Sequence, residues 1–214
     1  MKKVSIIINY SEDRGWLHEA IASAHAQDYP NVEVIVEYGP DKNASENANN
    51  GIARCTGDYI KYLSEDDFLP PDCVSRSVET LEATGADFIY GCAYNFRDIE
   101  GSRKVTEIVP VNQQVTLKDF RYRNPLHGGT LMYTKEALEF VRESRGFIFD
   151  QSLEDAQETD LNMWLLSHDR RTEFCPHFLY WYRYHDKQTS TGRGINQVKR
   201  ADRINAVIRR YFPA

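Results

Sequence analysis

The sequence predicts an α/β fold built on a central, mostly parallel but mixed β-sheet flanked by helices, and three observations lead to it. Short β-branched segments such as residues 4–8 alternate with segments whose apolar residues recur at helical spacing. The links between them are short, as in right-handed βαβ units. The segment 59–63 runs directly into three consecutive carboxylates, and open α/β sheets bind ligands at such strand ends. We therefore expect one domain spanning residues 1–214.

The first half of the chain is expected to alternate strands with helices. The expected strands are 4–8, 32–36, 59–63 and 87–90, and the expected helices are 16–28, 44–54 and 71–83. Asn43 is a plausible N-cap, because its side chain can accept a hydrogen bond from a backbone N–H of the first helical turn. Pro71 can occupy the first turn of its helix, and residues 9–15 are expected to form a polar loop.

The second half is expected to depart from this alternation. Segments 92–96 and 105–109 flank a Glu-Gly-Ser turn and are predicted to pair as an antiparallel hairpin. The elements expected after it are a short helix at 116–122, a strand at 130–133, helices at 134–144 and 157–167, a strand at 178–184 and a helix at 197–211. The basic residues of that last helix are interpreted as a solvated face, or as a complement to the dipole at its C-terminus.

Composition argues against several classes of function. The formal net charge of -6 disfavours a nucleic-acid or anionic-membrane footprint. The four cysteines lie far apart, which indicates reduced thiols rather than a disulfide framework or a zinc site. Neither a secretory signal nor an apolar run of membrane-spanning length is recognised, so we expect a soluble, cytoplasmic protein.

The turn Glu65-Asp66-Asp67 is the first candidate site. Three neighbouring carboxylates repel one another unless a positive group neutralises them. A hard divalent cation takes oxygen ligands, often one or two carboxylates together with phosphate oxygens. An ordinary solvated acidic turn is the alternative, and the motif alone does not decide between them.

The ordered set of segments along the chain resembles the family 2 glycosyltransferases. The segments that carry the resemblance are VSIII at 4–8, QDYP at 27–30, EYG at 37–39, GDYI at 57–60, the acidic turn, FDQSL at 149–153, QETDL at 157–161 and YRYH at 182–185. The resemblance implies a single GT-A (Rossmann-like) domain, with a nucleotide-binding half at 1–91 and a sugar- and acceptor-binding half at 92–214. Such a domain can also be one module of a longer polypeptide.

The resemblance implies Mn²⁺ or Mg²⁺ as a cofactor, held against the diphosphate of a nucleotide-sugar. The acidic turn stands where the family has its Asp-x-Asp motif, with Ser64 in place of the first aspartate. Asp66 is then the expected metal ligand, and Asp67 or Glu65 is expected to assist it. Glu65 is also expected to contact the nucleotide. His185 matches a family histidine that approaches the diphosphate or the metal. A hydrogen-bonded histidine at a strand end is an equal alternative for it.

Four further nucleotide contacts are implied, at Asn9, Ser11, Glu37 and Asn49. Glu37 stands where the family has an aspartate facing the nucleobase, and a carboxylate that accepts from the N3–H of uracil would favour UDP. A surface acid at a strand end is the alternative for Glu37. The usual Pro-Thr-Tyr is replaced by Asn-Tyr-Ser at 9–11, and Ala48 replaces an arginine of the family.

The start of the expected helix 157–167 carries the implied chemistry. In inverting members, an aspartate preceded by a glutamate takes the proton of the acceptor hydroxyl, and Gln157-Glu158 occupies these two positions. A glutamate can act as general base when its carboxylate reaches the proton. The pair Glu154-Asp155 is an alternative that lies three residues out of register. Without the family, acids that complement the helix dipole would be the ordinary interpretation.

The loop His127-Gly128-Gly129 resembles the one that lines the sugar pocket, which Gln157 is expected to share. Glycines allow backbone to approach a ligand closely, although an ordinary turn is the alternative.

Three functions follow as hypotheses. The first is a metal-dependent, inverting transfer of a hexose, glucose-type or deoxyhexose, from a UDP-sugar to the hydroxyl of a glycan or other acceptor. The second is a non-catalytic nucleotide-sugar-binding relative, suggested by Ser64 and Ala48. The third, a sugar nucleotidyltransferase, needs a Gly-rich basic loop after the first strand, and residues 9–15 supply one glycine and one arginine.

Overall fold

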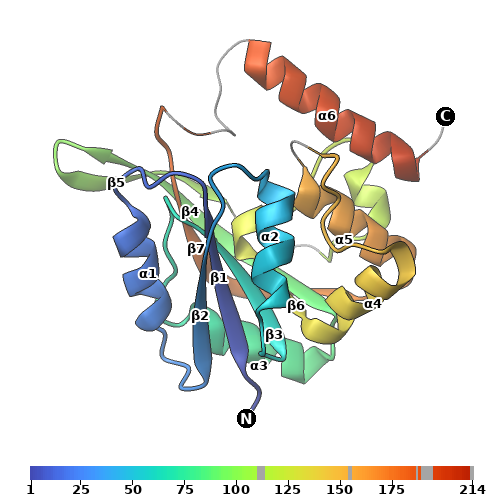
Figure 1. Cartoon of the computed structure of the whole chain (residues 1–214), viewed down its shortest axis with the longest axis horizontal. Coiled ribbons are helices and arrows are strands. Elements are labelled where there is room, and N and C mark those ends of the chain that lie inside the picture. Colours follow the sequence, from blue (N-terminus) through green and yellow to red (C-terminus); the bar gives the residue numbers. More distant parts are fainter. Residues whose placement is uncertain (110–113, 154–155, 187, 189–194, 213–214) are drawn as a thin grey trace.

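Among the residues that are described, seven strands form one mixed β-sheet at the centre of the molecule (Figure 1). The structure is a computed structural model and describes residues 1–109, 114–153, 156–186, 188 and 195–212. The strands are β1 (Val4–Tyr10), β2 (Val32–Tyr38), β3 (Tyr59–Ser64), β4 (Phe88–Ile99), β5 (Ser102–Val109), β6 (Met132–Thr134) and β7 (Thr172–Arg183). The α-helices are α1 (Leu17–His25), α2 (Ala44–Ala53), α3 (Cys73–Thr84), α4 (Lys135–Arg145), α5 (Gln157–Ser167) and α6 (Ile195–Tyr211). Two short 3₁₀ helices are η1 (Leu117–Arg121) and η2 (Gly128–Thr130).

The sheet has the strand order β2-β1-β3-β6-β4-β5, with β7 beside β4. Strand β1 pairs in parallel with β2 and β3, and β4 pairs in parallel with β7. Strand β6 runs antiparallel to both β3 and β4, and β5 returns from β4 as the predicted hairpin. Five strands therefore share one direction, which confirms the predicted α/β class with a mostly parallel, mixed sheet.

Apolar side chains of β1 pack on both faces of the sheet, because this strand lies between two others and under helices on either side. Ile7 packs in a cluster with residues of α2, α4 and α5, whereas Ile6 and Ile8 pack with residues of α1 and α3. The continuous β-branched run of β1 is the sequence consequence of burial on both faces.

Strand β4 is longer than the sequence predicts. Instead of two strands at 87–90 and 92–96, one strand of 12 residues runs through Gly91. A side chain at Gly91 would place its Cβ 2.6 Å from Cδ1 of Leu179, so the glycine is required by the close approach of β7. The residue that looks like a break in the sequence is therefore a packing requirement inside the sheet.

Local signals at the element ends mostly act as predicted. Helix α5 has the predicted bounds, and Asn43 caps α2 by accepting a hydrogen bond from the backbone N–H of Glu46 at 2.9 Å. Strand β1 extends to Tyr10, because Asn9 and Tyr10 still pair with β2. These two residues belong to the strand rather than to the expected loop.

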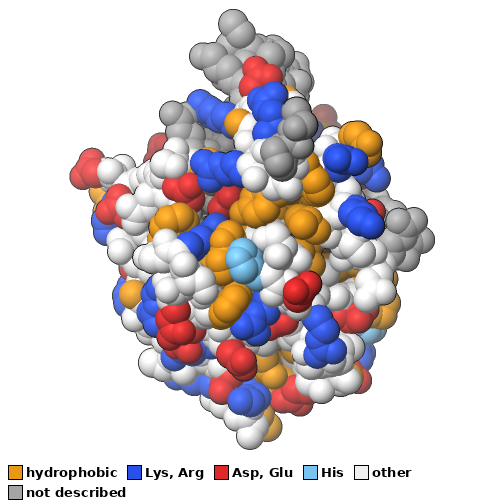
Figure 2. Space-filling model, turned by 90° about the vertical axis from the view of Figure 1, so that its right-hand side faces the viewer, with side chains coloured by type: hydrophobic (Ala, Val, Ile, Leu, Met, Phe, Trp, Pro, Cys, Tyr) orange, Lys and Arg blue, Asp and Glu red, His pale blue; other side chains and the backbone are white. Residues whose placement is uncertain are grey.

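The surface carries charges of both signs. On the face that Figure 2 shows, acidic and basic side chains are interspersed. No helix in the described part of the chain is long and apolar enough to cross a membrane.

Glu33 of β2 joins three segments at the N-terminal edge of the sheet. Its carboxylate accepts hydrogen bonds from the Ser5 hydroxyl at 2.5 Å and from the backbone N–H of Thr56 at 2.7 Å, and it pairs with Lys3 at 2.6 Å. Burial raises the pKa of Glu33, but the hydrogen bonds from Lys3, Ser5 and Thr56 outweigh burial and lower that pKa to about 2. Ionised Glu33 therefore stabilises the packing of β1, β2 and the turn before β3.

We expect Glu33→Gln to lower the free energy of unfolding at pH 7 by about 2 kcal/mol, because it removes hydrogen bonds to a charged group. The pKa of Glu33 in the folded protein lies below the ordinary value of 4.5. The stabilisation from ionised Glu33 is therefore complete above pH 4.5 and is lost as the pH falls through about 2. Urea unfolding between pH 7 and pH 2.5 should show a shallower loss of stability in the variant than in the wild type. Glu79→Gln, at a mostly exposed residue of α3, is the control. Equal acid dependence of all three proteins would contradict the prediction.

Candidate active site

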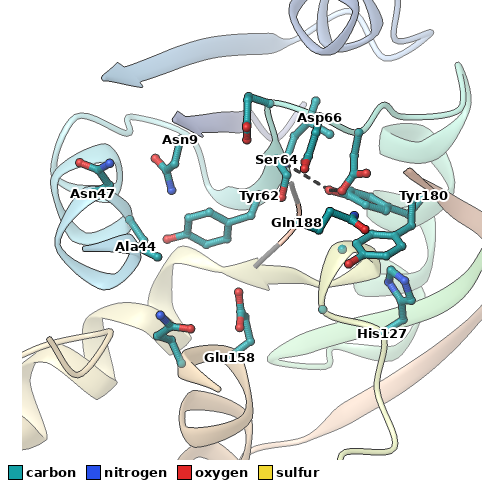
Figure 3. Close-up of a pocket in the computed structure, with 18 of the residues that line it drawn as sticks. Asn9, Ala44, Asn47, Tyr62, Ser64, Asp66, His127, Glu158, Tyr180 and Gln188 are labelled. Atoms are coloured by element: carbon teal, nitrogen blue, oxygen red, sulfur yellow. Dashed lines mark hydrogen bonds between the residues drawn. The ribbon is translucent and has the colours of Figure 1, made fainter. Parts of the chain in front are cut away.

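A cleft of about 800 Å³ opens at the carboxyl ends of β1 and β3. It is bounded by the N-terminus of α2, the η2 segment, the start of α5 and the end of β7. Of the residues predicted for the site, ten line this cleft: Asn9, Ser11, Glu65, Asp66, Asp67, His127, Gly128, Gly129, Gln157 and Glu158. Segments far apart in the sequence are thereby brought to one cavity (Figure 3).

Asp66 and His185 form a pair at the wall of the cleft. The Oδ2 atom of Asp66 lies 2.9 Å from Nε2 of His185, and the Asp66 residue is 8% exposed. The His185 ring packs against the indole of Trp16, with 4.6 Å between ring centroids. A carboxylate oxygen and an imidazole nitrogen are both ligands that suit Mn²⁺. Although His185 is absent from the residues that line the cleft, this contact brings it to the acidic turn.

Asp67 points into the fold. One of its carboxylate oxygens accepts a hydrogen bond from the Tyr180 hydroxyl at 2.8 Å, and the other accepts from the backbone N–H of Arg183 at 2.7 Å. Burial and the neighbouring Asp66 raise the pKa of Asp67 well above its ordinary value, against these two hydrogen bonds. Asp67 therefore fixes the shape of the turn, which leaves Asp66 better placed to contact a ligand.

Glu65 pairs with Arg14, which also lines the cleft. Burial and the adjacent Asp66 raise the pKa of Glu65 to about 7, although Arg14 acts in the opposite direction. Arg14 is thus a cation at the edge of the predicted metal site that the sequence analysis did not single out.

The donor set fits a divalent cation that completes its coordination with phosphate. Within the described residues, no group of three or more His, Cys, Asp or Glu side chains could hold a metal by itself. Asp66 and His185 would supply two protein ligands. Such a sparse protein set is typical of a cation that is also held by the phosphates of a substrate.

The end of the cleft between β1 and α2 is lined by polar groups that lack partners. Asn9 Oδ1, Ser45 Oγ, Asn47 Oδ1 and the Tyr62 hydroxyl are buried without a hydrogen-bond partner in the part of the chain that is described. An unpaired buried polar atom costs roughly 1–3 kcal/mol, so a ligand that pairs with these atoms is favoured. Ser45, Asn47 and Tyr62 were missed in the sequence, where the unusually polar composition of residues 43–50 was the available signal.

Glu37 and Asn49 lie outside the residues that line the cleft. Glu37 pairs with Arg54 at 2.8 Å and approaches Lys42 at 4.0 Å. The Asn49 amide exchanges two hydrogen bonds of 2.9 Å with the backbone of Phe149, whose ring packs edge-on against Tyr62. Asn49 therefore acts on the cleft through Phe149.

The other end of the cleft is formed by η2 and the start of α5. A Cβ at Gly129 would lie 2.3 Å from the Tyr180 ring, so only glycine fits there, and a Cβ at Gly128 would lie 3.9 Å from the Glu158 carboxyl carbon. Figure 3 shows Glu158 pointing from α5 into the cavity that Tyr62 and His127 also line.

His127 is neutral at ordinary pH. Burial and the charge of Lys61 lower the pKa of His127 to about 4, and its Nδ1 atom is buried without a hydrogen-bond partner among the described residues. A neutral imidazole can bind a hydroxyl group without repelling a cation.

The acids at the start of α5 take different positions. Asp160 is 1% exposed and pairs with Arg145 at 2.7 Å and Arg210 at 3.4 Å, whereas Glu158 lines the cleft. The alternative pair Glu154-Asp155 lies outside the described residues.

Comparisons with known proteins agree with this geometry. Residues 39–147, about half of the chain, match the family model described as Glycosyl transferase family 2. An uncharacterised glycosyltransferase from Rickettsia typhi is 27% identical over 92% of this chain and 68% of its own length. Another from Rickettsia felis is 27% identical over 74% of this chain, which spans 30% of that protein's length.

Two solved structures share the fold. They are residues 1–349 of TarS from S. aureus in complex with UDP-GlcNAc, and the mannosyltransferase PcManGT from Pyrobaculum calidifontis in complex with GDP-Man and Mn²⁺. Both have a TM-score of 0.66 and cover 98% of this chain, at 13% and 14% identity, with 71% and 64% of their own chains covered. The matched fold is that of GT-A glycosyltransferases, and the matched family segment contains α2, the acidic turn and η2. The chain therefore belongs to glycosyl transferase family 2.

Proposed function

We propose that this glycosyltransferase moves a hexose, glucose-type or deoxyhexose, from a UDP-sugar to the hydroxyl of a glycan or other acceptor, with inversion and with Mn²⁺ or Mg²⁺. The observation that carries the proposal is that Glu158 and the acidic turn with Asp66 line one cleft. The structural neighbours were solved with UDP-GlcNAc and with GDP-Man and Mn²⁺, which supports a nucleotide-sugar donor and a metal here. We place the protein in the cytoplasm.

The cleft residues divide into a nucleotide side and a transfer side. In this proposal residues 1–91 bind the nucleotide, with Asn9, Ser11 and Asn47 near the base or ribose. Residues 92–214 bind the sugar and the acceptor, through His127, Gly128, Gly129 and Gln157. The metal-binding pair joins the halves, since Asp66 comes from the first and His185 from the second.

Each protein group has a role in transfer. Asp66 and His185 would hold the cation, which neutralises charge on the departing diphosphate when it is bound. Glu158 would accept the proton of the acceptor hydroxyl while the oxygen attacks the anomeric carbon. Neutral His127 would hold a sugar hydroxyl. A non-catalytic relative with the same cleft would bind the donor without transferring its sugar, and a change at Glu158 would therefore have no transfer activity to remove.

We expect UDP to bind tightly only with a divalent metal, and more tightly with Mn²⁺ than with Ca²⁺, because two compact protein ligands suit the smaller ion. Asp66→Ala should remove the metal-dependent part of the affinity, at least about ten-fold or roughly 1.4 kcal/mol. Titration calorimetry with Mn²⁺, Ca²⁺ or a chelator measures both effects. Asp72→Ala, at a half-exposed acid immediately before α3, is the control and should bind as the wild type does. Identical UDP affinity in chelator and in Mn²⁺ would refute the metal site.

UDP should bind more tightly than CDP under the same metal, since a carboxylate or amide oxygen pairs with the N3–H of uracil but not with unprotonated N3 of cytosine. GDP, whose guanine also carries a ring N–H, is the purine comparison, and we expect it to bind less tightly than UDP. Two residues could accept the hydrogen bond from the N3–H of uracil. Glu37 is already paired with Arg54, whereas Asn47 lines the cleft, and mutations at the two positions distinguish them. If Glu37 contacts the base, Glu37→Gln weakens UDP binding and Asn47→Ala has the smaller effect. The reverse order would assign base contact to the amide, and tighter binding of GDP would exclude uracil as the preferred base.

Glu158→Gln keeps the shape of the side chain but cannot accept a proton, so transfer should fall by about two to four orders of magnitude. Affinity for UDP with Mn²⁺ should stay near the wild-type value, because Glu158 would contact the acceptor. The rate of UDP release from UDP-sugars with acceptor, and the anomeric configuration of the product, are the measurements. Asp155→Asn is the control for the out-of-register pair. Loss of transfer in Asp155→Asn but not in Glu158→Gln would move the base to Asp155, and a retained anomeric configuration would overturn the mechanism.

A further inference from the structure

Lys61 is a buried cation directly beneath the cleft. It lies in the middle of β3, is 0% exposed, and points to the face of the sheet that α1 and α3 cover, as do its strand neighbours Tyr59 and Leu63. Its Nζ atom donates hydrogen bonds to the backbone carbonyls of Gly129 and, at 3.2 Å, of Leu131. Within the described residues, no carboxylate forms an ion pair with it.

Burying such a charge is costly. An ammonium group loses several kcal/mol of hydration in a protein interior, and an apolar side chain would fill a core position of a strand without this loss. The partial compensation comes from the two carbonyls and from the Tyr180 ring, whose centroid lies 5.2 Å from Nζ. The hydrogen-bond partners of Lys61 therefore belong to η2 and to Leu131, the residue that follows it.

The two carbonyls flank Thr130 and so fix the segment His127–Leu131 from below. Above it, Gly129 packs against the Tyr180 ring, and the Thr130 hydroxyl donates to the His127 carbonyl at 2.8 Å. This segment presents His127 and Gly128 to the cleft, with Gly128 beside the Glu158 carboxyl group. Lys61 is thus bonded to the same short segment that faces the start of α5.

We propose that Lys61 is a positioning residue. It holds the segment His127–Leu131 in the position from which this segment contacts the sugar of the donor rather than its nucleotide. Its effect on donor binding rests on the function proposed above. Its effect on the segment itself does not depend on that function and can be measured separately.

The charge of Lys61 gives the proposal a test that needs no mutation. Burial lowers the pKa of Lys61 to about 8, although Cys73 of α3 acts in the opposite direction. The other titratable groups that face it are His127, with a pKa of about 4, Cys73, with a pKa of about 11, and Tyr180, whose pKa burial raises well above the ordinary value. Among these groups only Lys61 changes charge between pH 7 and pH 9, and its hold on the two carbonyls weakens as the proton leaves.

Hydrogen exchange reports the state of the segment directly. The backbone N–H of Thr130 donates to the His127 carbonyl at 3.0 Å, so its protection follows the order of η2. We expect that protection, normalised to the intrinsic rate at each pH, to fall at least about five-fold between pH 7 and pH 9 in the wild type. It should be low at both values in Lys61→Met. The N–H of Asp119 in η1, bonded to Thr116 at 3.1 Å, is the internal control. Unchanged Thr130 protection in the wild type across this pH range would overturn the proposal. This result needs only the wild type, so it decides the matter even if Lys61→Met does not fold.

Calorimetry with Mn²⁺ separates sugar from nucleotide, with UDP and UDP-glucose as the probes. Lys61→Met should weaken UDP-glucose at least about ten-fold and change UDP by less than about two-fold. Lys61→Arg retains a charge that does not titrate, so it should restore part of the UDP-glucose affinity and remove its loss at pH 9. Equal weakening of both probes would make Lys61 a structural residue only and overturn the proposal. If the wild type binds neither probe, the proposed function fails, while the exchange experiment still decides the role of Lys61.

Discussion

Three consecutive carboxylates share one turn at the end of β3, and two arginines hold that turn: Arg14 pairs with Glu65, and the turn is hydrogen-bonded to Arg183 of β7. This residue is 2% exposed; its backbone N–H donates to Asp67, and its Nε donates to the Asp66 carbonyl at 2.7 Å. Its guanidinium also pairs with Glu19 of α1 and Asp98 of β4. One buried cation therefore joins α1, the turn, β4 and β7. Water screens these two ion pairs, because the side chains of Glu19 and Asp98 are 31% and 42% exposed, but the hydrogen bonds of Arg183 still connect the site to the packing of the sheet.

This charge arrangement separates the roles of neighbouring acids. Because Tyr180 and Arg183 already donate to both oxygens of Asp67, that residue is committed to the fold. Asp66 is the residue of the turn that meets an imidazole at the cleft wall. Neighbouring acids of one turn thus differ in role: Asp67 is held by the fold, and Asp66 lies at the wall of the cleft beside His185.

The sequence predicts what depends on local pattern and fails where a contact between distant residues decides. The alternation of strands and helices, the Asn43 cap and the bounds of α5 follow from periodicity and capping chemistry, and all are found. The role of Gly91 is ambiguous in the sequence, since a glycine can end a strand or can lie inside one where a neighbouring strand packs closely. The close approach of β7 in the structure shows that the second role applies. Arg209 and Arg210 of α6 are exposed, as predicted for a solvated basic face, but the pairing of Arg210 with Asp150 and Asp160 could not be read from the sequence. Lys61 looks like an ordinary strand residue until its partners in η2 are known.

Neighbouring acids also differ in role at the start of α5. Glu158 and Asp160 are two residues apart and so lie on different sides of the helix. Arg145, Arg210 and the Tyr211 hydroxyl all contact the Asp160 carboxylate, which fastens α4 and α6 to α5. Proton transfer at Asp160 would leave the mostly buried guanidinium of Arg145 without its carboxylate partner, whereas Arg210 would keep Asp150. Glu158 lies instead on the side of Gly128, where it lines the cleft. The first turn of α5 therefore presents one acid to the packing of three helices and another to the cavity.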